Sequence, residues 1–507
     1  MNQGLHTLGR WLPERARATP DRVAIDYRDR LVTYAELERQ AQGLAAALGD
    51  AGLRHGDRVA TLTGNRPEHV ALLHACARLG LILLPLNRRL APAELRFQLE
   101  DAEPSLLLVE EELAELAVRA PGRSLRPAPF ESFAAAAALM LDDAGADAQL
   151  VEDDDGLLLI YTSGTTGRPK GALLTHGNCF WTNLAFDLTA GVTGEDVVLQ
   201  VLPQFHVGGW NVQALLAWWK GATVVLERSF DAGRCLALVE RKRVTTMMGV
   251  PANYLFMARE PGFATADLSS LRRAVVGGAP MPEALLKTWA GRGVAIVQGY
   301  GLTEAAPNVL CVPPEDAVRK AGCAGRPYPF VETALRDPSS GLLLDGPAHG
   351  ELVVRGPNVF PGYWGNGPET AAAFADGWLL TGDVAERDEE GFYRIRGRLK
   401  DMYISGGENV YPAEVEAVLH THADVADVAV VAVPDERWGE AGIAVVVARD
   451  GAAVTEEELL DLCGAQLAHF KVPCGVRFVS SLPRSGVGKL DKATLLAGLG
   501  LERTVAG

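Results

Sequence analysis

The chain has 507 residues, which is too long for one compact core and predicts at least two domains. Hydrophobic residues make up 48% and charged residues 22% of the sequence, which is ordinary globular composition and excludes a fibrous or disordered protein. The 48 basic and 64 acidic residues give a formal charge of −16 without a basic block. A nucleic-acid partner is therefore not expected, and any anionic ligand must be held by locally placed cations.

Seven cysteines are scattered along the chain without a CxxC pair. An odd count and irregular spacing argue against a disulfide framework and against a zinc site, and they suit a reducing cytosol. The first residues lack the apolar stretch of a signal peptide, and the apolar region at 133–141 is too short to cross a bilayer. These features predict a cytoplasmic protein without an integral membrane segment.

The first part of the chain alternates helical and strand patterns. Thr33 and Glu36 have the spacing of a capping box at the start of a helix. Residues 58–62 then predict a buried strand, residues 67–79 a helix, and residues 105–109 another strand. Strand–helix alternation with short turns predicts an α/β fold with mostly parallel sheets.

The middle of the chain continues this pattern before its texture changes. The alanine-rich segment 134–148 predicts a surface helix or a connection, and residues 156–161 predict a strand. Residues 273–276 and 294–297 predict two further strands, each of which ends in a glycine turn. Between residues 350 and 396, glycine, proline and short β-like runs predict an antiparallel, barrel-like part.

The last hundred residues have strand and helix patterns of their own. Helices are predicted at 412–420 and 456–468, and strands at 428–433, 443–447 and 476–479. The sequence thus predicts a large N-terminal domain, residues 1–398, and a small mobile α+β domain, residues 399–507.

A Gly/Ser/Thr loop follows the strand at 156–161, in the sequence YTSGTTGRPKG at 161–171. Its glycines let several backbone N–H groups point at one anion, its hydroxyls add donors, and Lys170 adds a cation. The glycine spacing differs from the common GxxxxGK nucleotide loop. A flexible surface turn is the alternative interpretation, but the unbroken run after a strand favours phosphate binding.

This loop resembles the signature of the adenylate-forming superfamily, which includes acyl-CoA synthetases, luciferases and peptide-synthetase adenylation domains. The resemblance extends in order over nearly the whole chain. The segment KDMYISGGENVYPAEVE at 400–416 is most similar to bacterial fatty-acyl-CoA synthetases. The resemblance implies an ATP-dependent carboxylic acid–CoA ligase that forms an acyl adenylate and pyrophosphate, then a thioester. ATP and coenzyme A would be cosubstrates and Mg²⁺ the cofactor.

The resemblance also implies which residues bind the nucleotide. In GYGLTE at 299–304, Tyr300 offers a flat face for adenine, Thr303 would contact the α-phosphate, and Glu304 would hold Mg²⁺ together with Thr165. A carboxylate at a helix N-terminus is the alternative for Glu304. The ATP-binding residues expected in this way are Thr162, Ser163, Gly164, Thr165, Thr166, Gly167, Lys170, Gly278, Ala279, Tyr300, Gly301, Asp383 and Arg398.

Four later residues complete the expected chemistry. Asp383 would accept two ribose hydroxyls, and Arg398 would meet ribose and phosphate. The resemblance makes Lys489 the catalytic cation of adenylation, although a lysine in a terminal loop is more often a solvated charge. Lys400 falls at the family's hinge, so that domain placement would gate the reaction.

The acid and the thiol would bind nearby. The turn Ser405, Gly406 and Gly407 would face coenzyme A, with an ordinary β-turn as the alternative. In PQFHVGGW at 203–210, His206 would border the carboxylate as an aromatic or polar contact. The expected acyl-pocket residues are His206, Val207, Gly208, Trp210, Val250, Gly277 and Gly301. No acidic residue lies in 203–210, and the other residues of this neighbourhood are apolar or aromatic, which predicts a fatty or other hydrophobic acid: Trp210, Val212, Val250, Pro251, Tyr254 and Leu255.

Two other functions remain open on the sequence. A related ligase could load a separate carrier-protein thiol, although only 18 residues (507 minus 489) follow Lys489. A catalytically silent nucleotide-binding protein is the alternative from another class. It is disfavoured because Lys170, Glu304, Asp383 and Lys489 are all present.

Overall fold

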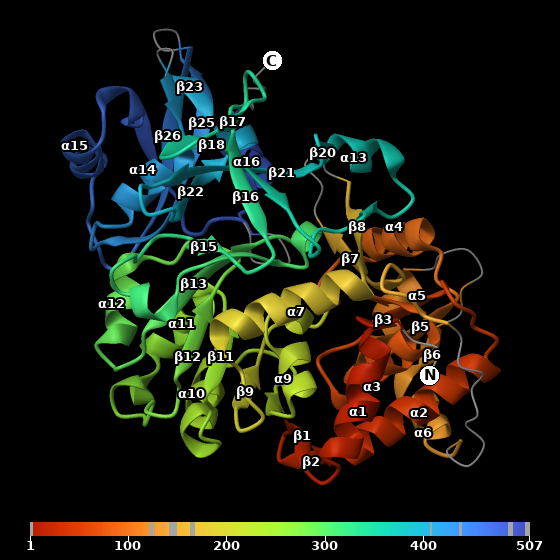
Figure 1. Cartoon of the computed structure of the whole chain (residues 1–507). Helices are drawn as coiled ribbons and strands as arrows, with labels where there is room; N and C mark the ends of the chain where they lie inside the picture. The colour runs from red at the N-terminus through yellow and green to blue at the C-terminus, as the bar shows by residue number, and fades with distance from the viewer. Residues whose placement is uncertain are drawn as a thin grey trace. The chain divides into compact units, whose positions relative to one another are not determined.

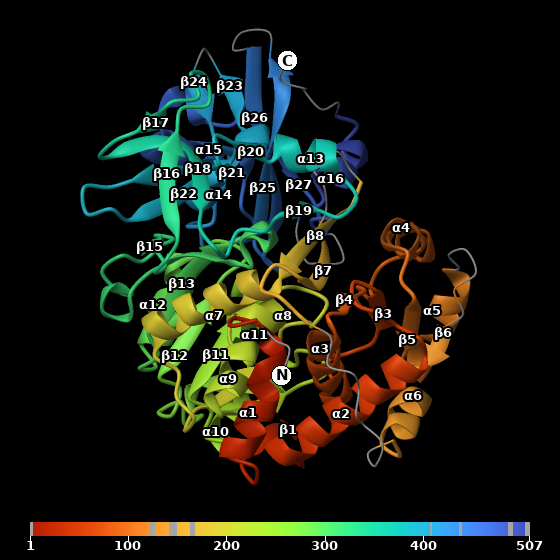
Figure 2. The same ribbon diagram turned by 45° about the vertical axis from the view of Figure 1, so that its right-hand side comes forward.

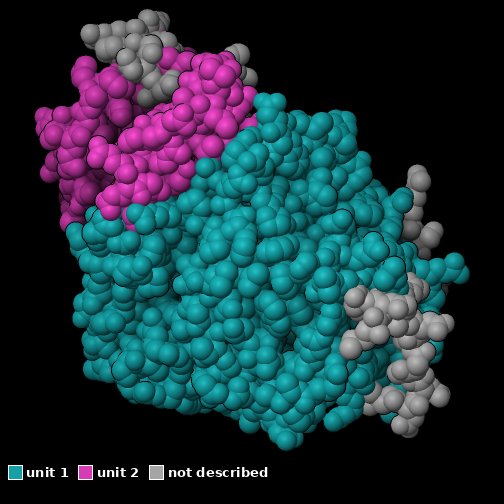
Figure 3. Space-filling model, viewed as in Figure 1, with its two compact units in different colours: residues 1–333, 354–379 teal, residues 334–353, 380–507 magenta. Residues whose placement is uncertain are grey.

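A computed structural model of the chain describes residues 4–120, 125, 127–140, 150–162, 168–405, 408–435, 439–484 and 490–501. The chain divides into two compact units (Figure 3). Unit 1 comprises residues 1–333 and 354–379, and unit 2 comprises residues 334–353 and 380–507. Unit 2 therefore contains residues 334–353 and 380–398 of the antiparallel part as well as the described residues after it. The functional boundary at residue 398 stays a prediction.

The first sheet of unit 1 contains the strands on which the phosphate loop depends. Its order is β19-β8-β7-β4-β3-β5-β6. The central strands run parallel, whereas β7 and β8 form an antiparallel hairpin. The predicted strands at 58–62, 105–109 and 156–161 are confirmed as β3, β5 and β7. The bounds are β3 Arg58–Leu62, β4 Ile82–Pro85, β5 Leu106–Val109, β6 Pro127–Pro129, β7 Gly156–Thr162, β8 Lys170–Thr175 and β19 Gly362–Tyr363.

The second sheet of unit 1 has nine strands in the order β15-β14-β13-β12-β11-β9-β10-β1-β2. The six neighbouring strands β13, β12, β11, β9, β10 and β1 run parallel. At the two edges, β14, β15 and β2 pair in the antiparallel direction. The bounds are β1 Val23–Tyr27, β2 Arg30–Thr33, β9 Val197–Gln200, β10 Thr223–Leu226, β11 Thr246–Gly249, β12 Arg273–Val276, β13 Ile296–Gly301, β14 Asn308–Cys311 and β15 Arg326–Pro327.

Helices bury their apolar faces against these sheets. The helices α10, α11 and α12 lie together beside the second sheet (Figure 1), and Leu236, Tyr254 and Trp289 from them join one core with its strands. Thr33 and Glu36 form the predicted capping box at the start of α2. The helices of unit 1 are α1 Trp11–Ala18, α2 Tyr34–Asp50, α3 Pro67–Leu79, α4 Pro92–Ala102, α5 Ala114–Arg119, α6 Phe130–Ala137, α7 His176–Ala190, α8 Gly208–Asn211, α9 Ala214–Lys220, α10 Ala232–Arg241, α11 Pro251–Arg259, α12 Glu283–Ala290 and α13 Gly367–Ala372.

The predicted antiparallel part is confirmed as a third sheet of order β17-β16-β18-β21-β20, with β22 added to β21. Its residues 334–353 and 380–398 belong to unit 2. The bounds are β16 Glu332–Arg336, β17 Leu343–Leu344, β18 Ala348–Arg355, β20 Phe374–Ala375, β21 Trp378–Arg387 and β22 Tyr393–Arg398.

A fourth sheet forms the C-terminal part of unit 2, with the order β24-β23-β26-β25 and β27 parallel to β26. Val415 of α14 and Leu459 of α15 pack into its core. These strands and helices match the α+β pattern predicted after residue 398. The bounds are β23 Tyr403–Ser405, β24 Glu408–Val410, β25 Val425–Asp435, β26 Gly439–Ala448, β27 Gly475–Phe478, α14 Pro412–Leu419, α15 Glu456–Gln466 and α16 Lys492–Gly498. In the described part of the chain, no helix has the length and hydropathy needed to span a bilayer.

Candidate active site

Three neighbouring parallel strands of the second sheet end at the same edge. In register, Gly249 of β11 lies opposite Val276 of β12, which lies opposite Gln298 of β13. The residues just beyond these positions are therefore brought together at the carboxyl edge, where open α/β sheets bind ligands. They are the predicted site residues Val250, Gly277, Gly278, Ala279, Tyr300 and Gly301.

The turn after β12 passes close to the turn after β11. Gly278 has φ +79°, and a Cβ there would lie 3.5 Å from Cγ1 of Val250. Gly277 is buried, and a Cβ on it would come within 3.0 Å of Met248 Cε. The missing side chains thus let the loops pack closely, while Gly278 and Ala279 remain exposed.

The segment GYG differs from its prediction. The sequence indicated a glycine turn directly after residue 297, but β13 continues to Gly301 because it pairs with the antiparallel strand β14. A Cβ on Gly301 would lie 1.9 Å from the carbonyl oxygen of Pro307, so glycine is needed for this close approach. Tyr300 is consequently a strand residue and is partly exposed.

Thr303 and Glu304 lie in a short 3₁₀ turn, Thr303–Ala305, immediately after β13. The backbone N–H of Phe360 donates to the Glu304 carbonyl at 2.9 Å, and the Asn358 amide donates to the Ala305 carbonyl at 2.9 Å. The side chain of Glu304 is fixed separately, because the Tyr363 hydroxyl donates to its Oε1 at 2.9 Å. Burial and the neighbouring carboxylates of Glu304 and Glu369 raise the pKa of Tyr363, so this hydroxyl keeps its proton.

Lys170 begins β8, directly opposite Thr162 at the end of β7. Its ammonium pairs with the carboxylate of Glu369 from α13 and lies 5.0 Å from the ring centroid of Tyr363. The side chain of Lys170 is only 10% exposed. Tyr363 therefore contacts the expected phosphate cation with its ring and the expected metal ligand with its hydroxyl.

Asp383 and Arg398 form a second group of site residues, in unit 2. Arg398 Nε donates to Asp383 Oδ1 at 2.7 Å, and its Nη1 donates to the Thr381 carbonyl at 3.1 Å. The two residues face each other in the β21–β22 ladder. Asp383 is 4% exposed, so the guanidinium compensates a charge that is almost buried.

Glu351 supports the turn that carries Asp383. One of its carboxylate oxygens accepts from the Gly382 N–H at 3.1 Å, and Arg336 Nη1 lies 3.6 Å from the other. Burial raises the pKa of Glu351, against the lowering effects of that N–H and of Arg336. Gly382 itself has φ +66°, which glycine adopts without strain.

The segment 203–210 rests on a buried polar network in unit 1. The Asn65 amide oxygen accepts from the Gln204 N–H at 2.9 Å, and the Gln204 carbonyl accepts from the Trp210 indole at 2.6 Å. His69 Nδ1 lies 3.2 Å from Gln204 Oε1. Trp210 is fully buried, Val207 is 7% exposed, and His206 and Gly208 are partly exposed. These buried hydrogen bonds thus hold the segment in place, while His206 and Gly208 remain accessible.

Other predicted residues are placed without a resolved site geometry. Lys400 lies in the 3₁₀ turn Leu399–Asp401, and Ser405 ends β23 with 2% exposure. Ser163, Gly164, Thr165, Thr166, Gly167, Gly406, Gly407 and Lys489 lie outside the described residues. Their expected roles stay predictions.

The residues fit an oxygen-bound cation such as Mg²⁺. Mg²⁺ is usually bound by one or two carboxylates together with substrate phosphates, rather than by a complete protein cage. Glu304 provides such a carboxylate, and among the described residues its Oε2 has no partner. The described residues contain no group of three or more His, Cys, Asp or Glu side chains suited to a metal.

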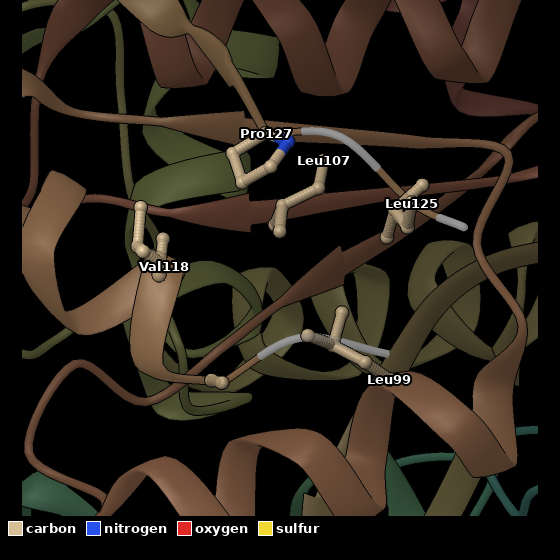
Figure 4. A pocket seen from close by; sticks show the side chains of 7 residues that line it. Leu99, Leu107, Val118, Leu125 and Pro127 are labelled. Carbon is tan, nitrogen blue, oxygen red and sulfur yellow. The ribbon is translucent and has the colours of Figure 1, made fainter. Parts of the chain in front are cut away.

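An apolar hollow of about 180 Å³ lies elsewhere in unit 1 (Figure 4). Its lining contains no titratable side chain, so it offers no group that could bind a phosphate, hold a cation or transfer a proton. The lining residues are Leu99, Leu107, Ala117, Val118, Ala120, Leu125 and Pro127.

Three supporting residues escaped the sequence-based prediction: Tyr363, Glu369 and Glu351. Asn366 caps Glu369 N–H at 3.2 Å, and this N-x-x-E spacing is a recognisable helix start. That local signal places Glu369 in a first helical turn, but it gives no indication of the pairing with Lys170. The pairing depends on β19 joining β8, a contact between distant parts of the sequence.

Comparison with known proteins adds an independent result. The family model described as "AMP-binding enzyme" matches residues 12–364, and the model "AMP-binding enzyme C-terminal domain" matches residues 414–489. A feruloyl-CoA synthase of an Amycolatopsis species is 45% identical over 492 residues, covering 97% of this chain and 98% of that protein. An indoleacetate–CoA ligase of Aromatoleum aromaticum is 41% identical and covers 96% of each.

The similarity extends to a fatty-acid ligase and to solved structures. A long-chain-fatty-acid–CoA ligase of Mycobacterium tuberculosis is 37% identical, covering 97% of this chain and 98% of that protein. The crystal structure of ATP-bound MatB from Rhodopseudomonas palustris has a TM-score of 0.90 at 33% identity, covering 97% of this chain and 98% of that one. Identity is thus higher to the feruloyl and indoleacetate enzymes than to the long-chain ligase.

Proposed function

The chain belongs to the AMP-binding enzyme family and is an AMP-forming acid–thiol ligase; from this premise we propose that it activates a hydrophobic carboxylic acid with ATP and transfers the acyl group to coenzyme A. The observation that carries this proposal is the link from Lys170 through Tyr363 to Glu304. This link supports the proposal because Lys170, a cation suited to phosphates, and Glu304, a carboxylate suited to Mg²⁺, both contact Tyr363.

In this proposal each half of the nucleotide has its own residues. Lys170 and the loop 162–167 hold the phosphates, and Thr303 donates to the α-phosphate. Tyr300 lies against the adenine beside the exposed turn Gly278–Ala279. Asp383 accepts the ribose hydroxyls while Arg398 keeps its carboxylate oriented at 2.7 Å.

Glu304 holds the cation, and Thr165 assists it. Bound Mg²⁺ would neutralise charge on the phosphate oxygens as pyrophosphate departs. The carboxylate of the acid attacks the α-phosphorus, and Lys489 stabilises the charge that develops between the two reacting groups. Catalysis then consists mainly of positioning and electrostatic stabilisation, because the phosphoryl chemistry requires little else of the protein.

The second step requires another arrangement of the chain. We place the boundary at residue 398 and the hinge at Lys400, so that residues 399–507 turn between the two half-reactions. Lys489 then leaves the site, and Ser405, Gly406 and Gly407 come to face the thiol of coenzyme A. The thiol attacks the acyl carbonyl, and AMP departs with the electron pair of the broken C–O bond.

Planar aromatic acids are the preferred substrates in this proposal. The acyl pocket would be formed by His206, Val207, Gly208, Trp210, Val250, Gly277 and Gly301, of which Trp210 is fully buried and would support the accessible residues His206 and Gly208. The relatives named for feruloyl and indoleacetate groups share 45% and 41% identity, against 37% for the long-chain ligase. A fatty acid is the second candidate.

All seven cysteines are free thiols, which suits the cytoplasm as the site of action.

The test is a panel of acids assayed for pyrophosphate release and for thioester, each with and without coenzyme A. The panel should include hydroxycinnamic, indole-containing, succinylbenzoic and long-chain fatty acids. The proposal expects acid-dependent pyrophosphate and a thioester, with the highest kcat/KM for a planar aromatic acid. Lys489→Ala serves as the control that should lose pyrophosphate release.

The outcomes separate the alternatives. Adenylate formation without thioester at any coenzyme A concentration would point to a carrier-protein thiol as acceptor. A preference for long-chain acids would overturn the aromatic assignment and leave the ligase class intact. The absence of acid-dependent pyrophosphate with every acid class would exclude the ligase function itself.

A further inference from the structure

Tyr363 joins the two charged groups of the unit 1 site that the proposed chemistry needs. It belongs to β19, at the edge of the first sheet beside β8 (Figure 2). Its hydroxyl donates to Glu304 at 2.9 Å, and its ring centroid lies 5.0 Å from the ammonium of Lys170. We propose that Tyr363 is a positioning residue that fixes Glu304 for Mg²⁺ and Lys170 for the nucleotide phosphates, an inference that rests on the function proposed above.

Glu304 needs such support because its own element is short. It lies in a 3₁₀ turn of three residues, whose backbone is held by Phe360 and Asn358 but whose carboxylate has no other hydrogen bond within the described structure. A free glutamate side chain would lose rotamer entropy on binding a cation. The Tyr363 hydroxyl removes part of this freedom in advance, while Oε2 remains available for the metal.

Lys170 is supported on two sides. The carboxylate of Glu369 pairs with its ammonium, and the Tyr363 ring presents its negative π face to the same group. The ammonium is thereby held at the start of β8 while the nucleotide is absent. When the nucleotide binds, its phosphate oxygens can replace the Glu369 carboxylate as the partner of the ammonium, without a rearrangement of the backbone.

A purely structural role is the alternative for Tyr363. Its ring packs edge-on against Phe360 at 4.9 Å between centroids, and its backbone N–H donates to Thr370 Oγ1 at 2.9 Å. In that case removal of the hydroxyl would change stability or nothing at all, and it would not act selectively on the metal-dependent part of nucleotide binding.

The test separates the hydroxyl from the ring in the full-length enzyme. Binding of an ATP analogue with a non-cleavable α,β-methylene bridge is measured by calorimetry, without acid, once with Mg²⁺ and once with EDTA. Tyr363→Phe should reduce the strengthening by Mg²⁺ about tenfold, the size expected for one hydrogen bond to a charged group, and leave binding in EDTA unchanged. Tyr363→Leu should also weaken binding in EDTA, because Lys170 loses its aromatic support.

Two further variants make the result specific. Tyr34→Phe is the matched control, since it removes a buried hydroxyl that donates to the Ala222 carbonyl at 2.7 Å, and it should alter neither measurement. In a Glu304→Gln background, Tyr363→Phe should have no additional effect on the Mg²⁺ dependence, because the two residues would act as one unit. Melting temperatures of all variants report any general loss of stability.

Several results would overturn the inference. An unchanged Mg²⁺ dependence in Tyr363→Phe, or an equal loss with and without Mg²⁺, would assign Tyr363 a structural role. Additive effects of Tyr363→Phe and Glu304→Gln would show that the hydroxyl does not act through Glu304. Failure of the proposed function is distinguishable, because there the wild-type enzyme would bind no analogue, or Glu304→Gln alone would keep the full effect of Mg²⁺. The central comparison, binding with Mg²⁺ against binding with EDTA, needs only Tyr363→Phe to fold.

Discussion

Asp383 is almost buried, yet the sequence assigns it a ligand rather than a place in the core. At 4% exposure an unpaired carboxylate would be strongly destabilising, and Arg398 provides the compensating charge at 2.7 Å. Glu351 fixes the neighbouring Gly382 N–H at 3.1 Å, so the backbone that carries Asp383 is constrained as well. The carboxylate is thus paired and oriented before any ribose binds.

Asp383→Asn tests whether the oriented carboxylate of Asp383 binds the ribose. The amide keeps the shape but removes the charge, and its NH₂ group would face the Arg398 guanidinium in one orientation. We expect ATP to bind about tenfold more weakly or worse, since hydrogen bonds to charged groups contribute about 1.5–3 kcal/mol. Calorimetry with ATP measures the loss. Asp337→Asn is the control, because the Asp337 side chain accepts from Ser339 and Ser340 in an exposed turn, and equal losses in both variants would contradict the assignment.

The charged residues proposed for the site were inferred from sequence motifs, whereas the side chains that contact them could not be inferred. Lys170, Glu304 and Asp383 each lie in a local glycine-rich motif whose chemistry is visible in sequence. Tyr363 and Glu369 contact them only because β19 pairs with β8, and no local pattern encodes that pairing. Side chains in local motifs are thus easier to propose from sequence than the side chains that hold them in place.

At the scale of elements, apolar runs predicted the parallel strands well. Strands β3 and β12 have the predicted bounds because parallel strands covered on both faces are continuous apolar segments. The end of β13 was missed because Gly299-Tyr300-Gly301 looks like a turn by composition. Its extended conformation is imposed by pairing with β14, which is a tertiary effect.

Gly301→Ala tests why glycine is required in this strand. The new Cβ would lie 1.9 Å from the Pro307 carbonyl oxygen, which is backbone and cannot rotate away. We expect a loss of about 1–3 kcal/mol in stability, as for an overpacked core, together with weaker binding of MgATP because Thr303 and Glu304 follow directly. Thermal unfolding and calorimetry measure the two effects.

Gly49→Ala is the matched control for that substitution. Gly49 lies in α2, and a Cβ there would meet no atom within 4 Å. Alanine should therefore be neutral or stabilise the helix by up to about 1 kcal/mol. If Gly301→Ala were as well tolerated as Gly49→Ala, the close approach of β14 would not be what requires the glycine.

At the scale of the whole molecule, three buried histidines couple stability to pH. His69, His74 and His176 are at most 3% exposed. Burial lowers their pKa from 6.5 to about 4, about 3 and about 4, respectively. Leu8 N–H donates to His176 Nδ1 at 3.1 Å, a bond that requires the unprotonated nitrogen. All three are therefore neutral in the folded protein at neutral pH.

Lowered histidine pKa values make the folded protein less stable at low pH. Below pH 6.5 the unfolded chain binds protons at these histidines and the folded protein does not, so the free energy of unfolding falls as the pH is lowered toward 4. Each histidine contributes about 1.4 kcal/mol per pH unit in this range. Glu351 and Glu416, whose pKa values are raised by burial, act in the opposite direction.

Urea unfolding between pH 7.0 and 5.0 measures this dependence. The midpoint should fall steadily, and His74→Met should reduce the slope by about one proton because His74 no longer titrates. His422→Met is the comparison variant, since His422 is partly exposed. A midpoint that stays constant from pH 7.0 to 5.0 would show that the buried histidines are not the dominant titrating groups.

The proposed turning of residues 399–507 would act on the ion pairs around Glu414. Within unit 2, Glu414 Oε2 lies 2.5 Å from Lys471 Nζ, and its Oε1 lies 4.0 Å from Arg396 Nη1. Arg396 precedes the proposed hinge at Lys400, whereas Glu414 and Lys471 follow it. A rotation about Lys400 would therefore separate Arg396 from Glu414 but leave Glu414 paired with Lys471.

Removing this contact should shift the balance between the two arrangements. The pair is partly exposed, with side chains 32% and 16% accessible, so its contribution is about 0.2–1 kcal/mol, or up to about fivefold in a rate. We expect Arg396→Ala to change adenylation and thioester formation from a supplied acyl adenylate in opposite directions. Arg396 also pairs with Glu386, which lies before the hinge, so Glu386→Ala removes that pair without touching the Glu414 contact and should not reproduce the effect. Arg449→Ala, which loses only a bond to the Ala423 carbonyl at 2.6 Å, should change neither.

The opposite signs distinguish a rotation from general damage. If the Arg396–Glu414 contact stabilises one of the two arrangements, it favours the half-reaction of that arrangement over the other. Loss of the contact should then slow the favoured half-reaction and speed the other. If Arg396→Ala lowered both rates by the same factor, the contact would be structural within unit 2. The two half-reactions would then not require Arg396 and Glu414 to part, and the hinge would have to lie elsewhere than at Lys400.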